Sequence, residues 1–339
     1  MTRRRLMTRT LASGAAAIVG YPTVSRRLSG NRTQAAGPDV GGPKVAGLKR
    51  RFTLDLSWGA IGVRASQTEA IELASRHGFE SVYADPGFLA AQDEAALSDL
   101  KATMKQHHIV WGAAGLPVEF RRDEAAFQAG LKQLPAMARA LQRAGVTRVS
   151  TWLKPFHEEL TYVANFRQHA RRLRQCVKIL GDHNQRFGME YVGPKTLWSS
   201  QRHTFIHTMA ETKDLIAEIG EDNVGLVLDS WHWYTAHETV TDLKTLTNND
   251  IVACDLNDAP AGIEIDQQID NQRHLPSATG VIDLKSFLNV LTDIGYDGPV
   301  RAEPFNAALN ALDNDQACAA TAAAMRQAFS LVENQQQKT

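Results

Sequence analysis

The chain has 339 residues, of which 43% are hydrophobic, enough for one large folded core. Its 37 Lys and Arg residues balance 37 Asp and Glu residues, so no basic field favours binding to nucleic acid. Three widely spaced cysteines form neither a zinc-binding spacing nor a disulfide framework, and no apolar run of about 18 residues predicts a membrane span.

Residues 1–36 are predicted to be an export signal that is not part of the fold. Residues 2–7, with Leu6 and Met7 at the two apolar positions, resemble a twin-arginine motif, and a stretch rich in Ala and Gly follows. Cleavage is expected near Ala35, and the alternative is a basic tail. Residues 37–50 are predicted to be a linker because they are rich in Gly and Pro. The expected location is periplasmic or otherwise extracytoplasmic.

From residue 51 onward, segments with strand patterns and segments with helix patterns alternate. Strands are predicted at 52–58, 79–84, 109–115, 146–152, 187–192, 224–229, 251–256 and 300–303. They alternate with predicted helices at 67–77, 93–107, 123–144, 158–186, 204–219, 240–246, 283–294 and 312–332. Eight such units predict an α/β protein with a single-domain (β/α)₈ TIM barrel at 51–332 and a polar tail at 333–339. An open doubly wound sheet is the alternative, although it usually has fewer strands.

Acidic side chains lie at the carboxyl ends of four successive predicted strands. They are Glu190, Asp229, Asp255 and Glu303, and a closed barrel places its active site at this edge. Buried carboxylates are costly and raise one another's pKa, whereas one divalent cation would satisfy all four. Oxygen ligands suit Mg²⁺ or Mn²⁺, and imidazole shifts the preference toward Mn²⁺, Co²⁺ or Zn²⁺. The sequence therefore predicts one divalent metal ion, Mn²⁺, Mg²⁺ or Co²⁺, with Zn²⁺ as a further option.

The carboxyl-terminal half resembles the xylose isomerase-like TIM-barrel superfamily of sugar isomerases and epimerases. Its members carry a Glu, an Asp, usually a His and a final Glu on successive strands around one divalent metal. Glu190, Asp229 and Glu303 match three of these positions. Asp255 opens an Asp-x-x-Asp phrase where the family usually has His-x-x-Asp. The resemblance therefore implies that Asp255 is either a fourth ligand or a neighbour of the ligands.

Contacts to a substrate are expected from two sources. The resemblance implies that His232, in an Asp-x-x-His spacing, and Arg273, in a stretch similar to an Arg-x-x-Pro-Gly-x-Gly loop, contact the substrate. From their residue type alone, Trp58, Trp152 and Trp231 are candidates to stack on the apolar face of a sugar. Packing in the core is the alternative for each of these tryptophans.

The chemistry that this site implies is proton transfer beside a carbonyl, through an enediolate. Glu190 and Glu303 would act on the two faces of the substrate carbon, one removing a proton and the other returning one. The outcome would be isomerisation or epimerisation, so the protein is predicted to be an isomerase. A leaving group β to the carbanion would instead give elimination, and a keto-glycoside lyase is therefore an alternative. A non-catalytic sugar-binding barrel is another.

The expected partner is a small-molecule sugar or keto-sugar. An apurinic endonuclease of the same fold would need several His at the ends of the second and third predicted strands. These ends read Tyr-Ala-Asp-Pro and Gly-Ala-Ala-Gly, so no nucleic acid partner is expected. No stable membrane span is expected either, and the oligomeric state stays open, a homo-oligomer included.

Overall fold

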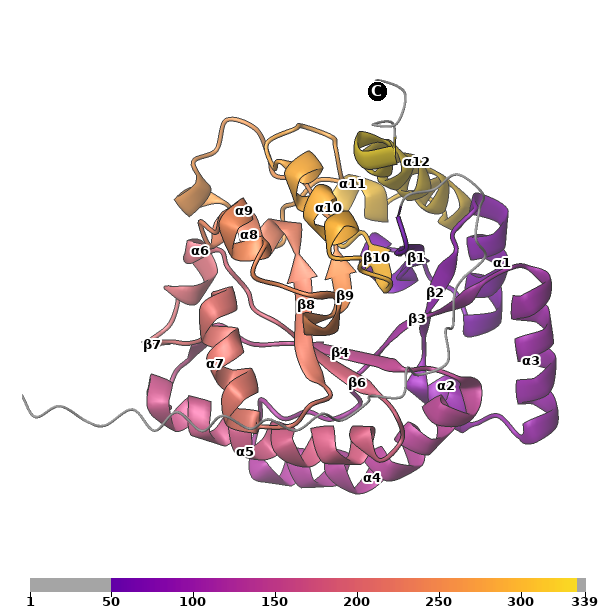
Figure 1. The fold of residues 1–339 in the computed structure, drawn as a ribbon, viewed down its shortest axis with the longest axis horizontal. Helices are drawn as coiled ribbons and strands as arrows, with labels where there is room; N and C mark the ends of the chain where they lie inside the picture. Colours follow the sequence, from indigo (N-terminus) through magenta and orange to yellow (C-terminus); the bar gives the residue numbers. More distant parts are fainter. Residues whose placement is uncertain (1–49, 334–339) are drawn as a thin grey trace, which may run out of the picture. The chain divides into compact units, whose positions relative to one another are not determined.

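Eight parallel strands close into a barrel, which confirms the predicted (β/α)₈ fold and excludes an open sheet (Figure 1). The computed structural model describes residues 50–333, so the predicted export signal and the tail after residue 333 lie outside the described residues. The barrel order is β1-β10-β9-β8-β6-β4-β3-β2. The strands are β1 (Thr53–Leu56), β2 (Ser81–Ala84), β3 (Val110–Gly115), β4 (Arg148–Trp152), β6 (Arg186–Glu190), β8 (Val224–Asp229), β9 (Ile251–Asp255) and β10 (Pro299–Arg301).

Helices surround the strands (Figure 1). The longer ones are α1 (Gln67–His77), α3 (Glu94–Gln106), α4 (Glu124–Ala144), α5 (Tyr162–Gly181), α7 (Met209–Ile219), α10 (Leu284–Asp293) and α12 (Asn314–Glu333). The short ones are α2 (Pro86–Ala90), α6 (Lys195–Trp198), α8 (Ser230–Thr235), α9 (Val240–Leu243) and α11 (Ala307–Asn310), with 3₁₀ turns η1 (Trp58–Ile61), η2 (Asn248–Asp250) and η3 (Ile265–Gln267).

The helices begin where the sequence provides a capping side chain. Ser66 accepts a hydrogen bond from the Glu69 N–H while the Glu69 carboxylate accepts one from the Ser66 N–H, which fixes the start of α1. Thr208 caps α7 through the N–H of Glu211. For this reason the predicted helix at 204–219 begins only at Met209. The residues before it include β7 (His203–Thr204), which pairs antiparallel with β5 (Phe156–His157) outside the barrel.

Strand register brings the predicted site residues to one level of the barrel. Asp229 of β8 lies beside Asp255 of β9, and Asp255 lies beside Arg301 of β10. Trp152 of β4 lies beside Glu190 of β6. Strands β8 and β9 are buried along their whole length, as expected for a parallel barrel covered by helices. Among the described residues, no helix is long and apolar enough to cross a membrane.

Candidate active site

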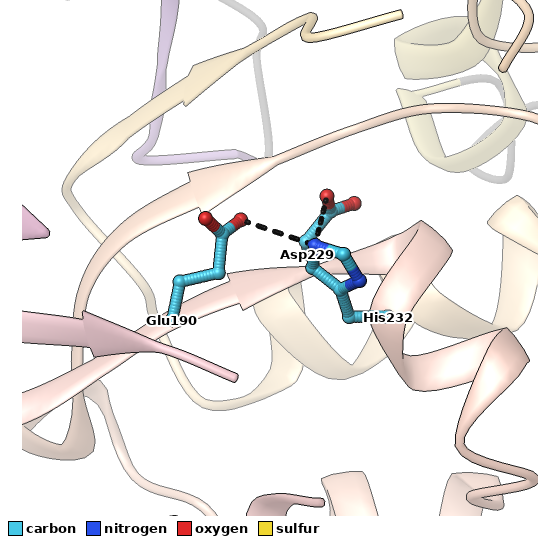
Figure 2. A group of neighbouring side chains, drawn as sticks. All are labelled: Glu190, Asp229 and His232. Atoms are coloured by element: carbon cyan, nitrogen blue, oxygen red, sulfur yellow. Dashed lines mark ion pairs between the residues drawn. The ribbon is translucent and has the colours of Figure 1, made fainter. Parts of the chain in front are cut away.

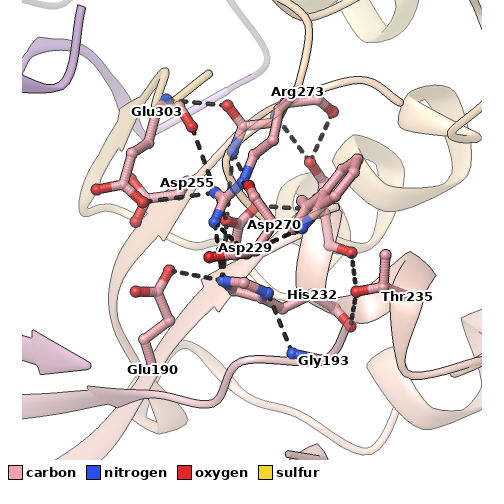
Figure 3. Close-up of polar contacts among 12 residues, drawn as sticks. Glu190, Gly193, Asp229, His232, Thr235, Asp255, Asp270, Arg273 and Glu303 are labelled. Atoms are coloured by element: carbon pink, nitrogen blue, oxygen red, sulfur yellow. Dashed lines mark hydrogen bonds and ion pairs between the residues drawn. The ribbon is translucent and has the colours of Figure 1, made fainter. Parts of the chain in front are cut away.

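The four predicted carboxylates meet at the carboxyl end of the barrel (Figure 3). Ligand atoms of Glu190, Asp255 and Glu303 lie within 4.8 Å of one another, and so do those of Glu190, Asp229 and His232. Glu190 belongs to both groups, and Figure 2 shows it facing Asp229 and His232. The structure therefore brings together every residue that was predicted to bind metal, together with one of the predicted substrate contacts.

Asp229 combines a capping role with a place in the site. Its Oδ1 accepts a hydrogen bond from the Trp231 N–H at 2.8 Å, which starts α8 directly after β8. Oδ1 also accepts from Asn257 Nδ2 at 3.1 Å, and Oδ2 accepts from Arg273 Nη1 at 2.8 Å. Capping and a functional role are thus compatible in this fully buried side chain, because Oδ1 caps α8 while Oδ2 faces Arg273, and Asn257 Nδ2 contacts both oxygens.

His232 is a neutral imidazole whose two ring nitrogens both face N–H groups. The Gly193 N–H lies 3.2 Å from Nδ1 and Arg273 Nη2 lies 3.3 Å from Nε2, so each nitrogen is placed to accept a hydrogen bond in one of the two tautomers. Nε2 lies 3.8 Å from Glu190 Oε1 and 3.7 Å from Asp229 Oδ2 (Figure 2). Burial and the neighbouring Arg273 charge hold the pKa of His232 well below its usual range. With the ring proton on Nε2 the side chain can donate a hydrogen bond to a substrate oxygen, and with the proton on Nδ1 its Nε2 can ligate a cation beside Glu190 and Asp229.

Arg273 extends from the loop after β9 into the middle of the acidic cluster (Figure 3). Besides Asp229, its Nη1 lies 3.5 Å from Glu303 Oε2, and its Nη2 donates to Asp270 Oδ1 at 2.8 Å. Nη2 also lies 3.3 Å from His232 Nε2. The predicted substrate-binding arginine is therefore buried among the carboxylates and neutralises part of their charge.

Asp255 has a guanidinium partner that the sequence reasoning missed. Arg301 donates from Nη2 to Asp255 Oδ2 at 3.0 Å and from Nε to Asp255 Oδ1. Both side chains are buried. The signal was available in principle, since Arg301 lies two residues before Glu303 and so has the spacing of side chains on one face of a strand.

Burial and mutual repulsion disfavour ionisation of these carboxyl groups. Burial, followed by the charge of Glu303, raises the pKa of Glu190 well above its usual value. Burial also raises the pKa of Asp229 to about 8 and that of Glu303 to about 7, although Arg273 opposes both shifts. Such clusters of shifted carboxyl groups are typical of active sites.

The cluster also fits a divalent cation. Oε1 of Glu190 is buried and has no hydrogen-bond partner among the described residues. Two buried guanidinium groups, those of Arg273 and Arg301, lie among a larger number of carboxyl groups: the buried ones of Asp55, Glu190, Asp229 and Asp255 and the half-buried one of Glu303. A cation beside Glu190 would satisfy its orphaned oxygen and offset part of this excess negative charge.

The three predicted tryptophans have different surroundings. Trp152, at the end of β4, is 45% exposed, and the Arg121 guanidinium lies 4.6 Å from its ring. Trp58 is half-buried in η1. Trp231 is fully buried, and its indole N–H donates to Asp270 Oδ1 at 3.2 Å. The structure thus presents Trp152 at the rim and packs Trp231 in the core, the alternative considered for each tryptophan.

Two further residues organise the site. Asn257 donates from Nδ2 to Asp229 and accepts the Glu303 N–H on Oδ1 at 2.9 Å, so it connects the Asp229 carboxylate to the backbone of Glu303. Asp258 accepts hydrogen bonds from the N–H groups of Thr279 at 2.9 Å and Gly280 at 2.8 Å, which anchors the loop after Arg273. Both belong to the Asp-Leu-Asn-Asp phrase, in which only Asp255 was predicted to bind metal.

Comparison with known proteins agrees with this geometry. The family model described as xylose isomerase-like TIM barrel matches residues 71–328. The inosose isomerase of Bacillus velezensis is 26% identical over 249 residues, which cover 69% of this chain and 82% of that protein. The structure of a xylose isomerase domain protein from Alicyclobacillus acidocaldarius has a TM-score of 0.71 and 29% identity, and the match covers 82% of this chain and 97% of that one.

The structure of an IOLI protein with a bound zinc atom has a TM-score of 0.68 and 21% identity, over 82% of this chain and 98% of that one, and it supports the fold alone. Because the family model spans most of the barrel, this chain belongs to the xylose isomerase-like TIM barrel family.

Proposed function

We propose that the protein is a metal-dependent isomerase or epimerase of a sugar or related keto-polyol. The observation that carries this proposal is the convergence of Glu190, the last residue of β6, and Glu303, two residues after the end of β10, with β8 and β9 between those strands. Burial raises the pKa of both groups, that of Glu303 to about 7, and a carboxyl group with a raised pKa suits proton transfer. The inosose isomerase relative supports the reaction class and suggests inososes among the substrates to test.

Glu190, Asp229 and Glu303 would hold the divalent ion, with Asp255 as a fourth carboxylate. Mn²⁺, Mg²⁺ or Co²⁺ suits this oxygen-rich set, and the zinc of the IOLI protein keeps Zn²⁺ as a further option. When bound, such an ion polarises a carbonyl oxygen and stabilises the negative charge that develops on it.

The chain's own side chains would carry the proton. One of the two carboxylates, Glu190 or Glu303, takes a proton from the carbon next to the carbonyl, and the other returns one. Return to the neighbouring carbon gives an isomer, whereas return to the opposite face of the same carbon gives an epimer. With its ring proton on Nε2, His232 would donate a hydrogen bond to a substrate oxygen, and Arg273 would orient the substrate while it balances the carboxylate charge.

Trp152, at the end of β4, supplies an aromatic face at the rim of the site, and Trp58, which follows β1, is a second candidate. Trp152 is the more exposed of the two, and Arg121 supports its ring. Trp231 contributes indirectly, since it lies under the Arg273 guanidinium, 5.5 Å from its ring centroid, and so helps to hold that side chain in place. We also propose that residues 1–36 direct export through a twin-arginine route, so that the enzyme meets its substrate outside the cytoplasm.

The test is an isotope-exchange experiment. Protein loaded with Mn²⁺ is incubated in D₂O with ketohexoses, inososes and 3-keto-glycosides, and deuterium is located by NMR. Deuterium on a carbon next to the carbonyl, lost when the metal is chelated, supports the proposal. Release of an aglycone would instead identify a lyase. Tight sugar binding with no exchange on any compound would refute catalysis and favour a binding protein.

A further inference from the structure

Asp55 is a buried acid that the proposed mechanism does not use. It lies on β1, is 1% exposed, and neither of its carboxylate oxygens has a hydrogen-bond partner among the described residues. The hydroxyl of its register neighbour Ser81 lies 2.7 Å from that of Thr53. Burial raises the pKa of Asp55, and this neutral hydroxyl opposes the shift without balancing the charge of the carboxylate. A Cβ at Gly112 would collide with Asp55 Oδ1, so the chain keeps space for this carboxylate inside the barrel. An unpartnered buried carboxylate is rare and costly, and its presence requires an explanation.

Arg301 lies between Asp55 and Asp255 at one level of the barrel. On one side, Arg301 and Asp255 are register partners on β10 and β9. On its other side, β10 pairs with β1, and Val300 lies beside Leu54. Arg301 and Asp55 are the next residues along these two strands, so they lie at the same level of the barrel. Asp55 and Arg301 also interact electrostatically. A single buried guanidinium is thus flanked by two buried carboxylates, and it makes its hydrogen bonds to only one of them.

Asp255 is also placed to bind a cation, and this role competes with its hydrogen bonds to Arg301. Its ligand atom lies within 4.8 Å of those of Glu190 and Glu303, a spacing that suits one cation. Both of its oxygens are nevertheless engaged by Arg301. A carboxylate that accepts two hydrogen bonds from a guanidinium is a weaker ligand, because the guanidinium already neutralises its charge.

We propose that Arg301 transfers its hydrogen bonds from Asp255 to Asp55 when a divalent cation binds, which frees Asp255 to become the fourth ligand. The transfer keeps Arg301 paired, gives the orphaned Asp55 a partner and leaves no buried carboxylate alone. Arg301 and Asp55 are then positioning residues, since they act on the ion through Asp255. This inference rests on the proposed function, because it requires that the site bind a divalent ion.

The experiment measures Mn²⁺ affinity by titration calorimetry on chelator-treated full-length protein. Asp55→Asn removes the charged acceptor while it keeps the size of the side chain. We expect it to weaken Mn²⁺ binding about 10- to 100-fold, the usual effect of losing a group that orients a ligand. Asp255→Asn should weaken binding as well, and adding Asp55→Asn to it should have no further effect, because no transfer remains to be made.

Asp297→Asn is the matched control. Asp297 accepts a hydrogen bond from Arg148 at 2.7 Å near the amino ends of the strands, so this variant removes an Arg–Asp pair remote from the site. Its Mn²⁺ affinity should equal that of the wild type. A crystal structure of the wild type with Mn²⁺ gives an independent test that needs no variant, and Arg301 should then be within hydrogen-bond distance of Asp55.

The outcomes separate this inference from the proposed function. If the wild type binds Mn²⁺ and Asp55→Asn binds it equally well, or if Arg301 stays on Asp255 in the Mn²⁺ structure, the transfer is refuted while the proposed metal enzyme stands. If Asp255→Asn keeps wild-type affinity, Asp255 is not a ligand and the transfer is refuted as well. If the wild type binds no Mn²⁺, both the transfer and the metal-dependent function are refuted.

Discussion

The metal-free protein should lose stability as the pH rises from about 6.5 to about 8. Burial raises the pKa of Glu303 to about 7 and of Asp229 to about 8, and that of Glu190 also lies well above its usual value. The folded chain therefore keeps protons that the unfolded chain, whose carboxyl groups titrate near pH 4, has already released. Because the folded state binds more protons in this window, the free energy of unfolding falls as the pH rises.

The magnitude follows from the number of protons retained. For each proton that the folded chain retains, the free energy of unfolding falls by about 1.4 kcal/mol per pH unit. With one retained proton, a rise of about 1.5 pH units therefore lowers it by about 2 kcal/mol. For a chain of this size that corresponds to a Tm lower by about 3 °C. Below about pH 6.5 the lowered pKa values of the buried His169 and His232 act in the opposite direction, because the unfolded chain takes up protons there.

The assay is thermal unfolding between pH 6.5 and 8, once with EDTA and once with excess Mn²⁺. An ion in the site favours the ionised carboxylates, so the Mn²⁺ sample should lose little stability, and the gap between the two curves should widen with pH. Asp229→Asn, which cannot ionise, should flatten the EDTA curve. A Tm that stays constant or rises with pH in EDTA would show that these carboxyl groups are not protonated in the folded chain.

Three further expectations concern single groups. Glu303→Gln should reduce kcat by about 100- to 10,000-fold with an unchanged circular dichroism spectrum, and near-normal turnover would exclude its acid–base role. Asn257→Ala removes the bonds to Asp229 and to the Glu303 backbone and should cost about 1–3 kcal/mol in stability, together with weaker Mn²⁺ binding in calorimetry; unchanged affinity would limit Asn257 to a structural role. Arg3→Lys with Arg4→Lys should retain the protein in the cytoplasmic fraction, and continued export would contradict a twin-arginine signal.

The barrel could be predicted because its signals are local and repeated. The predicted helix at 67–77 coincides with α1, since Ser66 and Glu69 form a capping box that is visible as a spacing. The apolar run at 224–229 coincides with β8, since a strand buried on both faces must be apolar throughout. The β5–β7 pair was missed because each strand has only two residues, too few to show a period.

The acidic residues of the site could be predicted for a related reason. In a parallel barrel every strand ends at the same rim, so the end of a strand in the sequence is also a position in space. Glu190, Asp229, Asp255 and Glu303 could therefore be grouped before any contact was known. Trp231 shows the limit of this reasoning, because Trp231 and Asp229 both lie at the end of β8, yet the ring packs in the core. Strand position gives the level of a residue in the barrel, whereas the direction of its side chain depends on the turn that follows.

Hydrogen-bond partners were the information that the sequence could not supply, as the phrase from Asp255 to Asp258 illustrates. Its polar residues lie within four positions, yet Asp255 pairs with Arg301, Asn257 connects Asp229 to Glu303, and Asp258 holds the loop after β9. Each of these partners is at least 21 residues away along the chain. A family motif with a His at the first position therefore cannot simply be read with an Asp in its place. An Asp at this position adds the negative charge of Asp255 to the carboxylates already in the barrel, and Arg301 is the group that balances that charge.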